Sequence, residues 1–379
     1  MLRPMRIAVL GAGAMGSAVA RLLARHDDTD IVVADVDEVR ARAAVDAAGG
    51  GRAEGIGGAP DALRALLKDV DALASCVPYR RNLEVMKAAL AAHCPYADLG
   101  GLFHMTLKQL ELDERFSEAG VPAVAGAGCC PGLSNVLAKL LEPRFDSVES
   151  IDIIDGAIEE GDAFGVPYSA ETILDEFSVP AQVFENGELR EVPAGSGAIR
   201  YRFPEPLGEM EAVYTLHSEP ATLPRSIAGV RDVRWRLALP PKIADGFRLL
   251  VDLGFASEDP VATRSGAAVP RQVLTAVLDR LGSSDGPPRD LEILVVRVAG
   301  QRDGYPAVVR CDATFRPTPE GISAGAFGTA SPMAVAARWL ATGRVPPGVH
   351  PPETAFDPTS FVDDLRAEGV EIDVTEDDA

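Results

Sequence analysis

The sequence predicts an α/β protein: an N-terminal doubly wound parallel sheet (a Rossmann domain) followed by a second α+β domain built on a mixed sheet. An apolar strand at residues 7–10 leads directly through a glycine-rich loop into an alanine-rich helix. Short apolar strands then alternate with helices as far as about residue 125. From about residue 126 the alternation stops, and strand-like segments dominate residues 148–315.

The composition narrows the class of protein. With 379 residues, the chain is long enough for two domains with buried cores. Hydrophobic residues make up 47% and charged residues 25%, as in ordinary globular proteins. The N-terminus enters a strand without a signal-peptide pattern, and no apolar run is long enough to cross a bilayer, so we expect a cytoplasmic location. The net charge of −21 disfavours nucleic acid and anionic membranes as partners.

The first loop has the spacing of a dinucleotide-binding motif. Its six residues are Gly11, Ala12, Gly13, Ala14, Met15 and Gly16. Gly11 allows a tight turn, Gly13 has no Cβ to keep phosphates away, and Gly16 lets the next helix approach the strand closely. That helix, over residues 14–25, points its N-terminal N–H groups at the phosphates. The alternative is a glycine-rich turn in some other βαβ unit.

The second strand, residues 31–34, ends in an acid that bears on cofactor choice. Asp35 stands at the position where a carboxylate accepts hydrogen bonds from the adenosine ribose, and we expect the next residue, Val36, to contact the cofactor as well. An acid here repels a 2′-phosphate, and no basic residue follows before Arg40. We therefore expect NAD as the cofactor, with NADP disfavoured.

The remaining elements of the first domain complete the alternation. Helices are expected at residues 40–48, 61–67, 83–92 and 107–119, and strands at 71–76, 96–99 and 121–124. Ligands of such sheets bind outside the carboxyl ends of the strands. We therefore expect the cofactor crevice to be lined at two strand ends by Cys76, Val77, Pro78, Asp98, Leu99 and Gly100.

The second half of the chain is predicted to contain more strands than helices. The expected strands are residues 149–154, 198–203, 232–239 and 291–299, and the expected helices are residues 134–141, 332–341 and 359–367. A surface loop is expected at 283–288, and the acidic C-terminal residues are expected to be frayed. The five cysteines form no CxxC pair and no ligand cluster with the five histidines, so we expect no metal site. Adjacent Cys129 and Cys130 are interpreted as buried thiols.

Several phrases match those of a known family. They are Asp98-Leu99-Gly100-Gly101, Cys129-Cys130-Pro131-Gly132-Leu133-Ser134-Asn135, Tyr168-Ser169-Ala170-Glu171-Thr172, Glu185-Asn186-Gly187, His217-Ser218-Glu219-Pro220-Ala221-Thr222-Leu223-Pro224 and Gly328-Thr329-Ala330-Ser331-Pro332. On these phrases, which run along nearly the whole chain, the sequence resembles the saccharopine dehydrogenase-like family and, within it, the L-lysine 6-dehydrogenase branch.

The resemblance implies an activity and a domain layout. The expected activity is NAD-dependent oxidation at the CH–NH bond of an amino acid, namely deamination of L-lysine at its ε-carbon. The expected layout is a dinucleotide-binding domain at residues 1–125, a substrate and dimerisation domain at 126–325, and C-terminal helices at 326–379 that pack back on the first domain. The resemblance also implies a homodimer or larger homo-oligomer.

Amine oxidation needs few protein groups, because the nicotinamide carries the hydride chemistry. The protein must accept a proton from the ammonium, which suits a carboxylate or a histidine. Asp98 ends a strand beside the crevice, where it acts either on the amine or as a carboxylate that satisfies loop N–H groups. His104 follows the same turn and either relays a proton or caps the next helix.

A second group of candidates lies further along the chain. His217 and Glu219 stand two residues apart on a strand-like segment, which predicts that they point to the same side. With Thr222 and Arg225 they either bind an amino-acid head group, Arg225 taking the carboxylate, or form a structural ion pair.

Three more residues are candidates for substrate contact. Tyr79 follows the strand end at Pro78 and either lines the crevice or serves as aromatic packing. Tyr168 and Glu171 either line the substrate pocket, or Glu171 is a first-turn acid of a helix that begins after Ser169.

Two other functions stay open. A saccharopine- or carboxynorspermidine-type reductase joins an amine to an aldehyde and needs more convergent arginines, for which Arg80, Arg81, Arg200 and Arg202 are available. The second is an NAD-binding sensor without chemistry.

Overall fold

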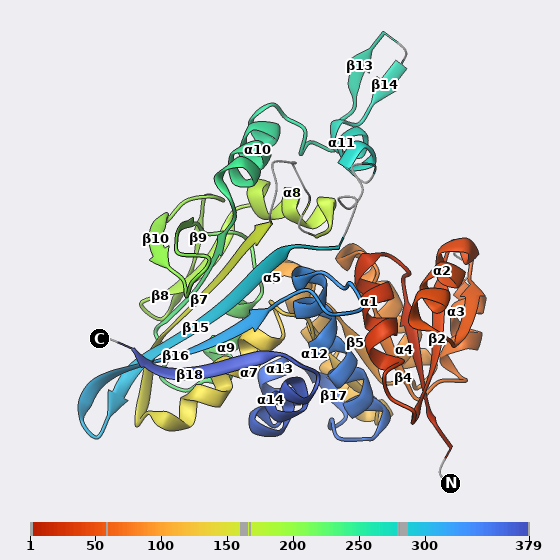
Figure 1. The fold of residues 1–379 in the computed structure, drawn as a ribbon, viewed down its shortest axis with the longest axis horizontal. Coiled ribbons are helices and arrows are strands. Elements are labelled where there is room, and N and C mark those ends of the chain that lie inside the picture. The colour runs from red at the N-terminus through yellow and green to blue at the C-terminus, as the bar shows by residue number, and fades with distance from the viewer. Residues whose placement is uncertain are drawn as a thin grey trace.

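The first sheet of the computed structural model is parallel throughout. The structure describes residues 3–57, 60–159, 166, 168–264, 266–278, 280 and 287–377. The strand order is β17-β6-β5-β4-β1-β2-β3 (Figure 1). The strands are β1 (Met5–Leu10), β2 (Thr29–Asp35), β3 (Arg52–Gly55), β4 (Ala72–Ser75), β5 (Tyr96–Asp98), β6 (Pro122–Val124) and β17 (Gly348–His350).

Both faces of this sheet are covered by helices, because its central strands are apolar on both sides. Ile7 and Val9 of β1 face one core, whereas Ala8 and Leu10 face the other. The helices of this domain are α1 (Ala14–Leu23), α2 (Glu38–Ala48), α3 (Pro60–Leu67), α4 (Asn82–Ala91), α5 (Leu102–Leu110) and α6 (Asp113–Ala119). The predicted Rossmann domain is therefore confirmed.

The second sheet is mixed, as predicted. Its order is β18-β16-β15-β7-β12-β8-β9; β7 and β12 are parallel and the other neighbours antiparallel. Its strands are β7 (Ser147–Glu159), β8 (Ala181–Glu185), β9 (Glu188–Val192), β12 (Asp232–Ala238), β15 (Asp290–Arg302), β16 (Tyr305–Phe315) and β18 (Glu371–Asp377). Helices α7 (Leu133–Leu141) and α9 (Glu219–Ser226) pack on β15 and β12 respectively.

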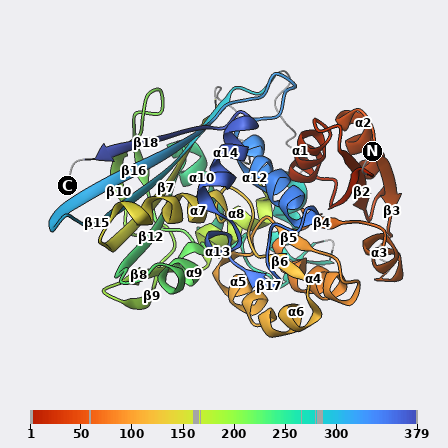
Figure 2. The ribbon, with the colours of Figure 1, turned by 90° about the horizontal axis from the view of Figure 1, so that it is seen from below.

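The C-terminal segment returns to both sheets. Helix α12 (Ala324–Ala341) contacts strands of both sheets and lies between them (Figure 2). The proline-rich stretch contains β17, which adds to the edge of the first sheet, and helices α13 (Pro352–Ala355) and α14 (Pro358–Ala367) follow. The chain then ends on β18 in the second sheet, so the expectation of a frayed end is wrong for residues 371–377. Ile372 of β18 is buried, which explains why this acidic strand stays paired.

Other boundaries differ from the sequence-based expectations. The helix predicted at residues 107–119 is two helices, α5 and α6, since acids at the first turn of α6 favour a new start. The strand expected near residue 200 belongs to a separate hairpin of β10 (Ile199–Arg202) and β11 (Glu209–Ala212). Helix α12 begins eight residues before Pro332, because the side chain of Ser323 caps it. The loop expected at residues 283–288 lies mostly outside the described residues.

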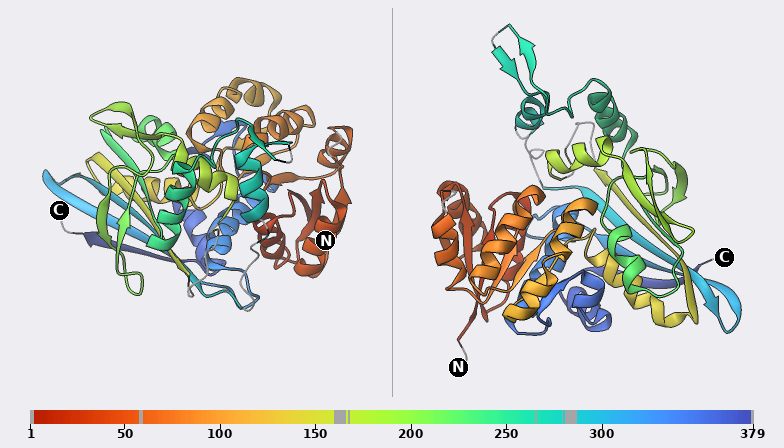
Figure 3. Two further views of the ribbon diagram at one scale, coloured as in Figure 1. Left: turned by 90° about the horizontal axis from the view of Figure 1, so that it is seen from above. Right: turned by 180° about the vertical axis from the view of Figure 1, so that it is seen from behind.

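Three helices form a lobe at one end of the second sheet. They are α8 (Ala170–Ser178), α10 (Pro241–Asp252) and α11 (Pro270–Leu278), which share one apolar cluster. The hairpin of β13 (Val261–Thr263) and β14 (Gly266–Ala268) projects from this lobe away from the body (Figures 1 and 3). Within the part of the chain that is described, no helix has the length and apolarity needed to cross a bilayer.

Candidate active site

The glycine loop after β1 has the geometry of a dinucleotide cradle. Gly11 has a φ of +97°, and a Cβ on it would lie 2.8 Å from the carbonyl oxygen of Cys76. A Cβ on Gly16 would lie 1.7 Å from the carbonyl oxygen of Gly11, so only glycine permits this approach of helix and strand. A Cβ on Gly13, in contrast, meets no atom within 4 Å. The open space at Gly13 faces the start of α1, where a pyrophosphate is stabilised by free N–H groups.

Asp35 occupies the carboxyl end of β2, next to this loop. Its two oxygens accept hydrogen bonds from the backbone N–H groups of Ala12 (2.7 Å) and Asp37 (2.9 Å). The carboxylate is therefore held against the loop, in the place where an adenosine ribose would offer its hydroxyls. Val36 beside it is 66% exposed. The residues present thus fit a nicotinamide dinucleotide.

Asp98 at the end of β5 ties two crevice loops together. Its carboxylate is fully buried and accepts hydrogen bonds from the N–H groups of Gly100 (2.8 Å) and Gly126 (3.0 Å). The Tyr96 hydroxyl (2.8 Å) and the Gln109 amide also donate to it. Burial raises the pKa of Asp98, and these four donors oppose that shift. With all four bonds made, the geometry favours the loop-holding role over direct action on an amine.

His104 stands apart from this network. It is exposed on the first turn of α5, with its ring edge against Phe103. The N-cap of α5 is Gly101, so His104 does not cap the helix.

His217 is the centre of a buried charged cluster. Its Nδ1 lies 3.1 Å from Glu219 Oε2, its Nε2 lies 3.7 Å from Glu176 Oε1, and its ring stacks on Trp235 with centroids 3.8 Å apart. Burial lowers the pKa of His217, but the two carboxylates outweigh it and raise the pKa to about 10. His217 is therefore an imidazolium at neutral pH.

The segment around His217 is not the strand that was expected. His217 precedes α9, and Glu219 is the first residue of that helix, yet the two side chains meet as predicted. Glu219 also accepts from the Ser134 hydroxyl (2.7 Å), and Thr222 accepts from the Asn135 amide (3.1 Å). Arg225, at the far end of α9, is exposed.

Two acids on the second sheet were missed by sequence reasoning. Asp155 on β7 and Glu292 on β15 lie on the same sheet face in the strand register, diagonal to each other, and Trp235 on β12 shares that face. Burial raises the pKa of Asp155 to about 7, and burial together with the Asp155 charge raises that of Glu292. The Oδ1 atom of Asp155 is buried without a hydrogen-bond partner among the described residues. The sequence signal that could have identified them is an acidic residue placed next to apolar residues within a predicted strand.

The crevice and the charged cluster meet at the loop after β6. Besides burial and Cys129, the charges of Asp155 and Glu219 raise the pKa of Cys130 in this loop, which places the loop beside both acids. Ser134, which donates to Glu219, follows on α7. The cluster therefore lies next to the strand ends that border the cofactor crevice.

A second junction joins the crevice to the helical lobe. Tyr79 follows β4, and its hydroxyl donates to Asp175 of α8 (2.5 Å). On the same helix Glu176 accepts from the Tyr168 hydroxyl. Ser169 is the N-cap of α8 and Glu171 lies in its first turn, as one of the two readings of Glu171 expected.

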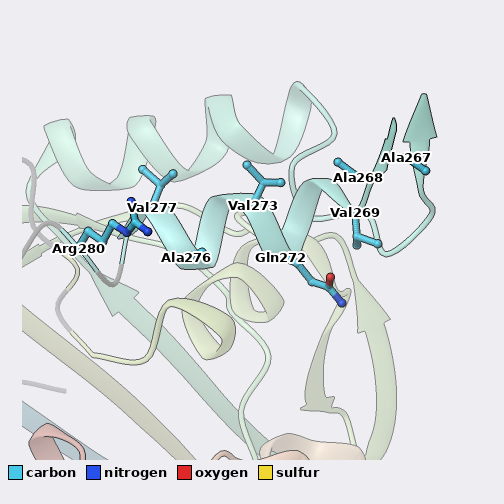
Figure 4. Close-up of a pocket in the computed structure, with 8 residues that line it drawn as sticks. All are labelled: Ala267, Ala268, Val269, Gln272, Val273, Ala276, Val277 and Arg280. Atoms are coloured by element: carbon cyan, nitrogen blue, oxygen red, sulfur yellow. The ribbon is translucent and has the colours of Figure 1, made fainter. Parts of the chain in front are cut away.

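The carboxylates outnumber the cations in this region. Glu176 and Glu219 flank His217, Asp155 interacts electrostatically with it, and Glu292 interacts with Asp155; this set of acids suits a cationic ligand. A separate groove runs along the exposed side of α11 (Figure 4) and contains no acid or histidine; its lining residues are Ala267, Ala268, Val269, Gln272, Val273, Ala276, Val277 and Arg280. Among the residues that can be described, no group of three or more His, Cys, Asp or Glu side chains could hold a metal ion.

Fold and site together define a class: a nicotinamide-dinucleotide-binding oxidoreductase with a second domain built on a mixed sheet. Two family models cover the chain. The saccharopine dehydrogenase NADP-binding domain matches residues 7–124, and the saccharopine dehydrogenase C-terminal domain matches residues 128–370. The chain belongs to the saccharopine dehydrogenase-like family and is an NAD(P)-dependent dehydrogenase-type enzyme.

Two similar curated proteins are carboxynorspermidine synthases. The one from Vibrio alginolyticus is 27% identical over 259 residues, which is 64% of this chain and 62% of the relative. The one from Vibrio cholerae is 25% identical over 328 residues, which is 79% of each chain.

Two solved structures share the fold over the whole chain. The L-Glu-forming saccharopine dehydrogenase of Saccharomyces cerevisiae has a TM-score of 0.78 at 17% identity, covering 99% of this chain and 100% of its own. The homospermidine synthase of Legionella pneumophila, in complex with NAD, has a TM-score of 0.72 at 13% identity, covering 100% and 93% respectively.

Proposed function

We propose that this enzyme forms or breaks a CH–NH bond and binds the amine in the carboxylate cluster around His217. The observation that carries this proposal is the excess of buried carboxylates directly beside the cofactor crevice. Burial without a matching cation raises the pKa of Asp155 and of Glu292, so an ammonium group of the substrate would supply the positive charge that stabilises their carboxylate forms.

Asp155 is the proposed proton acceptor. A bound nicotinamide supplies the hydride acceptor or donor. An ammonium must first lose a proton before its carbon can release hydride, and a base with a pKa near the working pH does this best. Asp155, with a pKa of about 7 and one oxygen without a hydrogen-bond partner among the described residues, meets this requirement. His217 already carries its proton, so it serves to orient Glu176 and Glu219 around the amine.

For the substrate, reductive joining of an amine to an aldehyde is the first candidate. The two carboxynorspermidine synthases among the relatives support it. In this direction the protonated form of Asp155 would donate its proton to the hydroxyl of the carbinolamine formed from amine and aldehyde, and this hydroxyl leaves as water when the imine forms.

Oxidation of L-lysine at its ε-carbon is the second candidate. The arrangement of the arginines favours this candidate. Arg80 and Arg271 meet at one place, Asp175, and a single group of arginines matches the single carboxylate of lysine. A saccharopine-type substrate has more carboxylates, whereas Arg81 and Arg200 are engaged elsewhere by Glu84 and Glu209. Arg202 lies with Arg200 on β10.

One spectrophotometric panel separates these candidates. The absorbance of the reduced cofactor is followed after the enzyme is mixed with NAD or NADP, in oxidised or reduced form, and a substrate. The substrates are L-lysine, saccharopine, and diamines plus an amino-acid semialdehyde. Consumption of reduced cofactor only when amine and aldehyde are both present supports coupling, and reduction by lysine alone supports deamination. Binding of cofactor without turnover of any amine would refute the proposal and leave the sensor hypothesis.

A further inference from the structure

We propose that Glu353 of helix α13 is a positioning residue of the amine site. Acting through two polar side chains at the start of α7, it holds the carboxylate of Glu219 in place against His217. The inference rests on the proposed function, in which Glu219 and His217 belong to the amine site. It gives a role to a buried acid that the proposed reaction does not itself use.

Glu353 is buried where α13 meets α7 and α9. The residue is 2% exposed, and its two oxygens accept hydrogen bonds from the Asn135 amide (3.0 Å) and the Ser226 hydroxyl (3.0 Å). The Thr222 hydroxyl also donates to it. Burial raises the pKa of Glu353, and these hydrogen bonds oppose that shift. Glu353 is therefore an acceptor around which side chains of two helices are arranged.

The carboxylate of Glu353 fixes the direction in which the Asn135 amide faces. A carboxylate only accepts hydrogen bonds, so the NH2 group of Asn135 faces it, and this group also donates to Thr222 Oγ1 (3.1 Å). The amide oxygen is turned to the other side, where it accepts from the Gly132 N–H (3.1 Å) and the Ser134 hydroxyl (3.3 Å). A reversed amide would place two acceptors together at Glu353 and two donors together at Gly132.

Ser134 extends this arrangement to the amine site. Its hydroxyl lies between the Asn135 oxygen and Glu219 Oε1, which is 2.7 Å away. The other oxygen of Glu219 lies 3.1 Å from His217 Nδ1. Ser134, Asn135 and Glu219 are each at most 1% exposed, so a broken bond would leave a buried polar group without its partner. Loss of the Glu353 carboxylate should therefore loosen the carboxylate that pairs with His217.

The position of Glu353 depends on the return of the chain to the first sheet. Strand β17 joins the edge of that sheet just before α13. Directly after α13, buried Phe356 packs against the rings of Trp339 and Phe361. Because the short helix is anchored on both sides, the carboxylate of Glu353 is held at a fixed place beside α7 and α9.

Nuclear magnetic resonance of the histidine ring nitrogens tests the proposal without a substrate. The signal of His217 is identified by its loss in His217→Gln, and its titration is followed in the intact chain. Three acids act on the charge of His217: Glu219 of α9, Glu176 of α8 and Asp155 of β7. The contacts described above connect Glu353 to the first of these.

Glu353→Gln keeps the size of the side chain but presents an NH2 group that cannot accept from Asn135. In this variant and in Ser134→Ala, the titration midpoint of His217 should fall by about one pH unit, because a loosened Glu219 stabilises the imidazolium less. Asp357→Ala is the matched control, since this exposed acid of the same segment caps α14. It should lower the melting temperature and leave the His217 titration unchanged.

Turnover gives a second readout, with L-lysine or with a diamine plus an amino-acid semialdehyde. Glu353→Gln and Ser134→Ala should each raise the KM for the amine about tenfold, and the double variant should raise it no further, because both act on one carboxylate. An unchanged His217 midpoint in Glu353→Gln, or single effects that multiply to about a hundredfold, would overturn the proposal. A shifted midpoint in a protein that turns over no amine would instead overturn only the proposed reaction.

Discussion

At the scale of single residues, the site depends on burial that changes the protonation of its acids and of His217. Glu176 and Glu219 keep His217 protonated, whereas Asp155 is pushed toward its neutral form. Two groups whose pKa values are driven apart in this way are suited to different tasks in proton transfer. The imidazolium orients, and Asp155 exchanges the proton.

This assignment predicts the pH dependence of the reaction. Because the pKa of Asp155 is raised to about 7, its base form becomes available only as pH rises through that value. The rate of amine oxidation should therefore rise with pH around 7. Asp155→Asn should lower kcat by about 100-fold or more and remove that inflection. Initial rates from pH 5.5 to 9 measure both effects.

The control for this prediction is Glu188→Gln on β9, where the side chain is exposed. It should leave both the rate and the pH profile unchanged. An Asp155→Asn enzyme that keeps the inflection near pH 7 would show that another group takes the proton.

At the scale of elements, two glycines of the β1–α1 junction have different roles. Gly16 is needed for the fold, whereas Gly13 is expected to be needed for cofactor binding. Gly16 is required by the protein itself, since its Cβ would collide with the carbonyl oxygen of Gly11. Gly13 has free space around it in the protein alone, and its φ of −74° is accessible to any residue. Its lack of a side chain matters only when a pyrophosphate approaches.

Two alanine substitutions test this division. Gly13→Ala should keep the melting temperature within about 2 °C but weaken cofactor binding at least about tenfold. Gly16→Ala should destabilise the fold by about 2 kcal/mol or more, because backbone rather than a flexible side chain must move. Thermal unfolding and cofactor titration of each variant give the two readouts. Equal losses of cofactor affinity and stability in Gly13→Ala would contradict the open-space argument.

The end of β2 predicts cofactor preference. The Asp35 carboxylate is held by the N–H groups of Ala12 and Asp37, so its charge stays where a 2′-phosphate would lie. Asp35→Ser should reduce kcat/KM with NAD and raise it with NADP, shifting their ratio by about tenfold or more. An unchanged ratio would refute the ribose role. The exposed Val39 on α2 offers a control as Val39→Ala.

At the scale of the whole molecule, the chain passes between its two sheets more than once. It leaves the first sheet after β6, returns with α12 and β17, and finishes in the second sheet with β18. Buried Glu353 on α13 strengthens this connection, since it accepts from Asn135 of α7 and Ser226 of α9. Elements α12, β17, α13 and β18 thus connect the two sheets.

The final strand should contribute measurably to stability. Ile372 of β18 is 5% exposed, and Ile372→Ala should lower the free energy of unfolding by about 2–4 kcal/mol. Thr375→Ala, on the exposed side of the same strand, should change it by less than about 0.5 kcal/mol. Urea unfolding followed by tryptophan fluorescence compares the two. Similar small effects would mean that β18 is not held to β16 in solution.

The sequence by itself determined the features that depend on neighbouring residues: the glycine loop, Asp35 at a strand end, the strand–helix alternation and the Ser169 cap. These signals are local, because backbone conformation and burial periodicity are set within a few residues. Only the tertiary structure decided which charged side chains meet. Asp155, Glu176, His217 and Glu292 come from β7, α8, the segment before α9, and β15, which are separated by up to more than a hundred residues. Their meeting depends on packing between distant segments, and no local pattern encodes such packing.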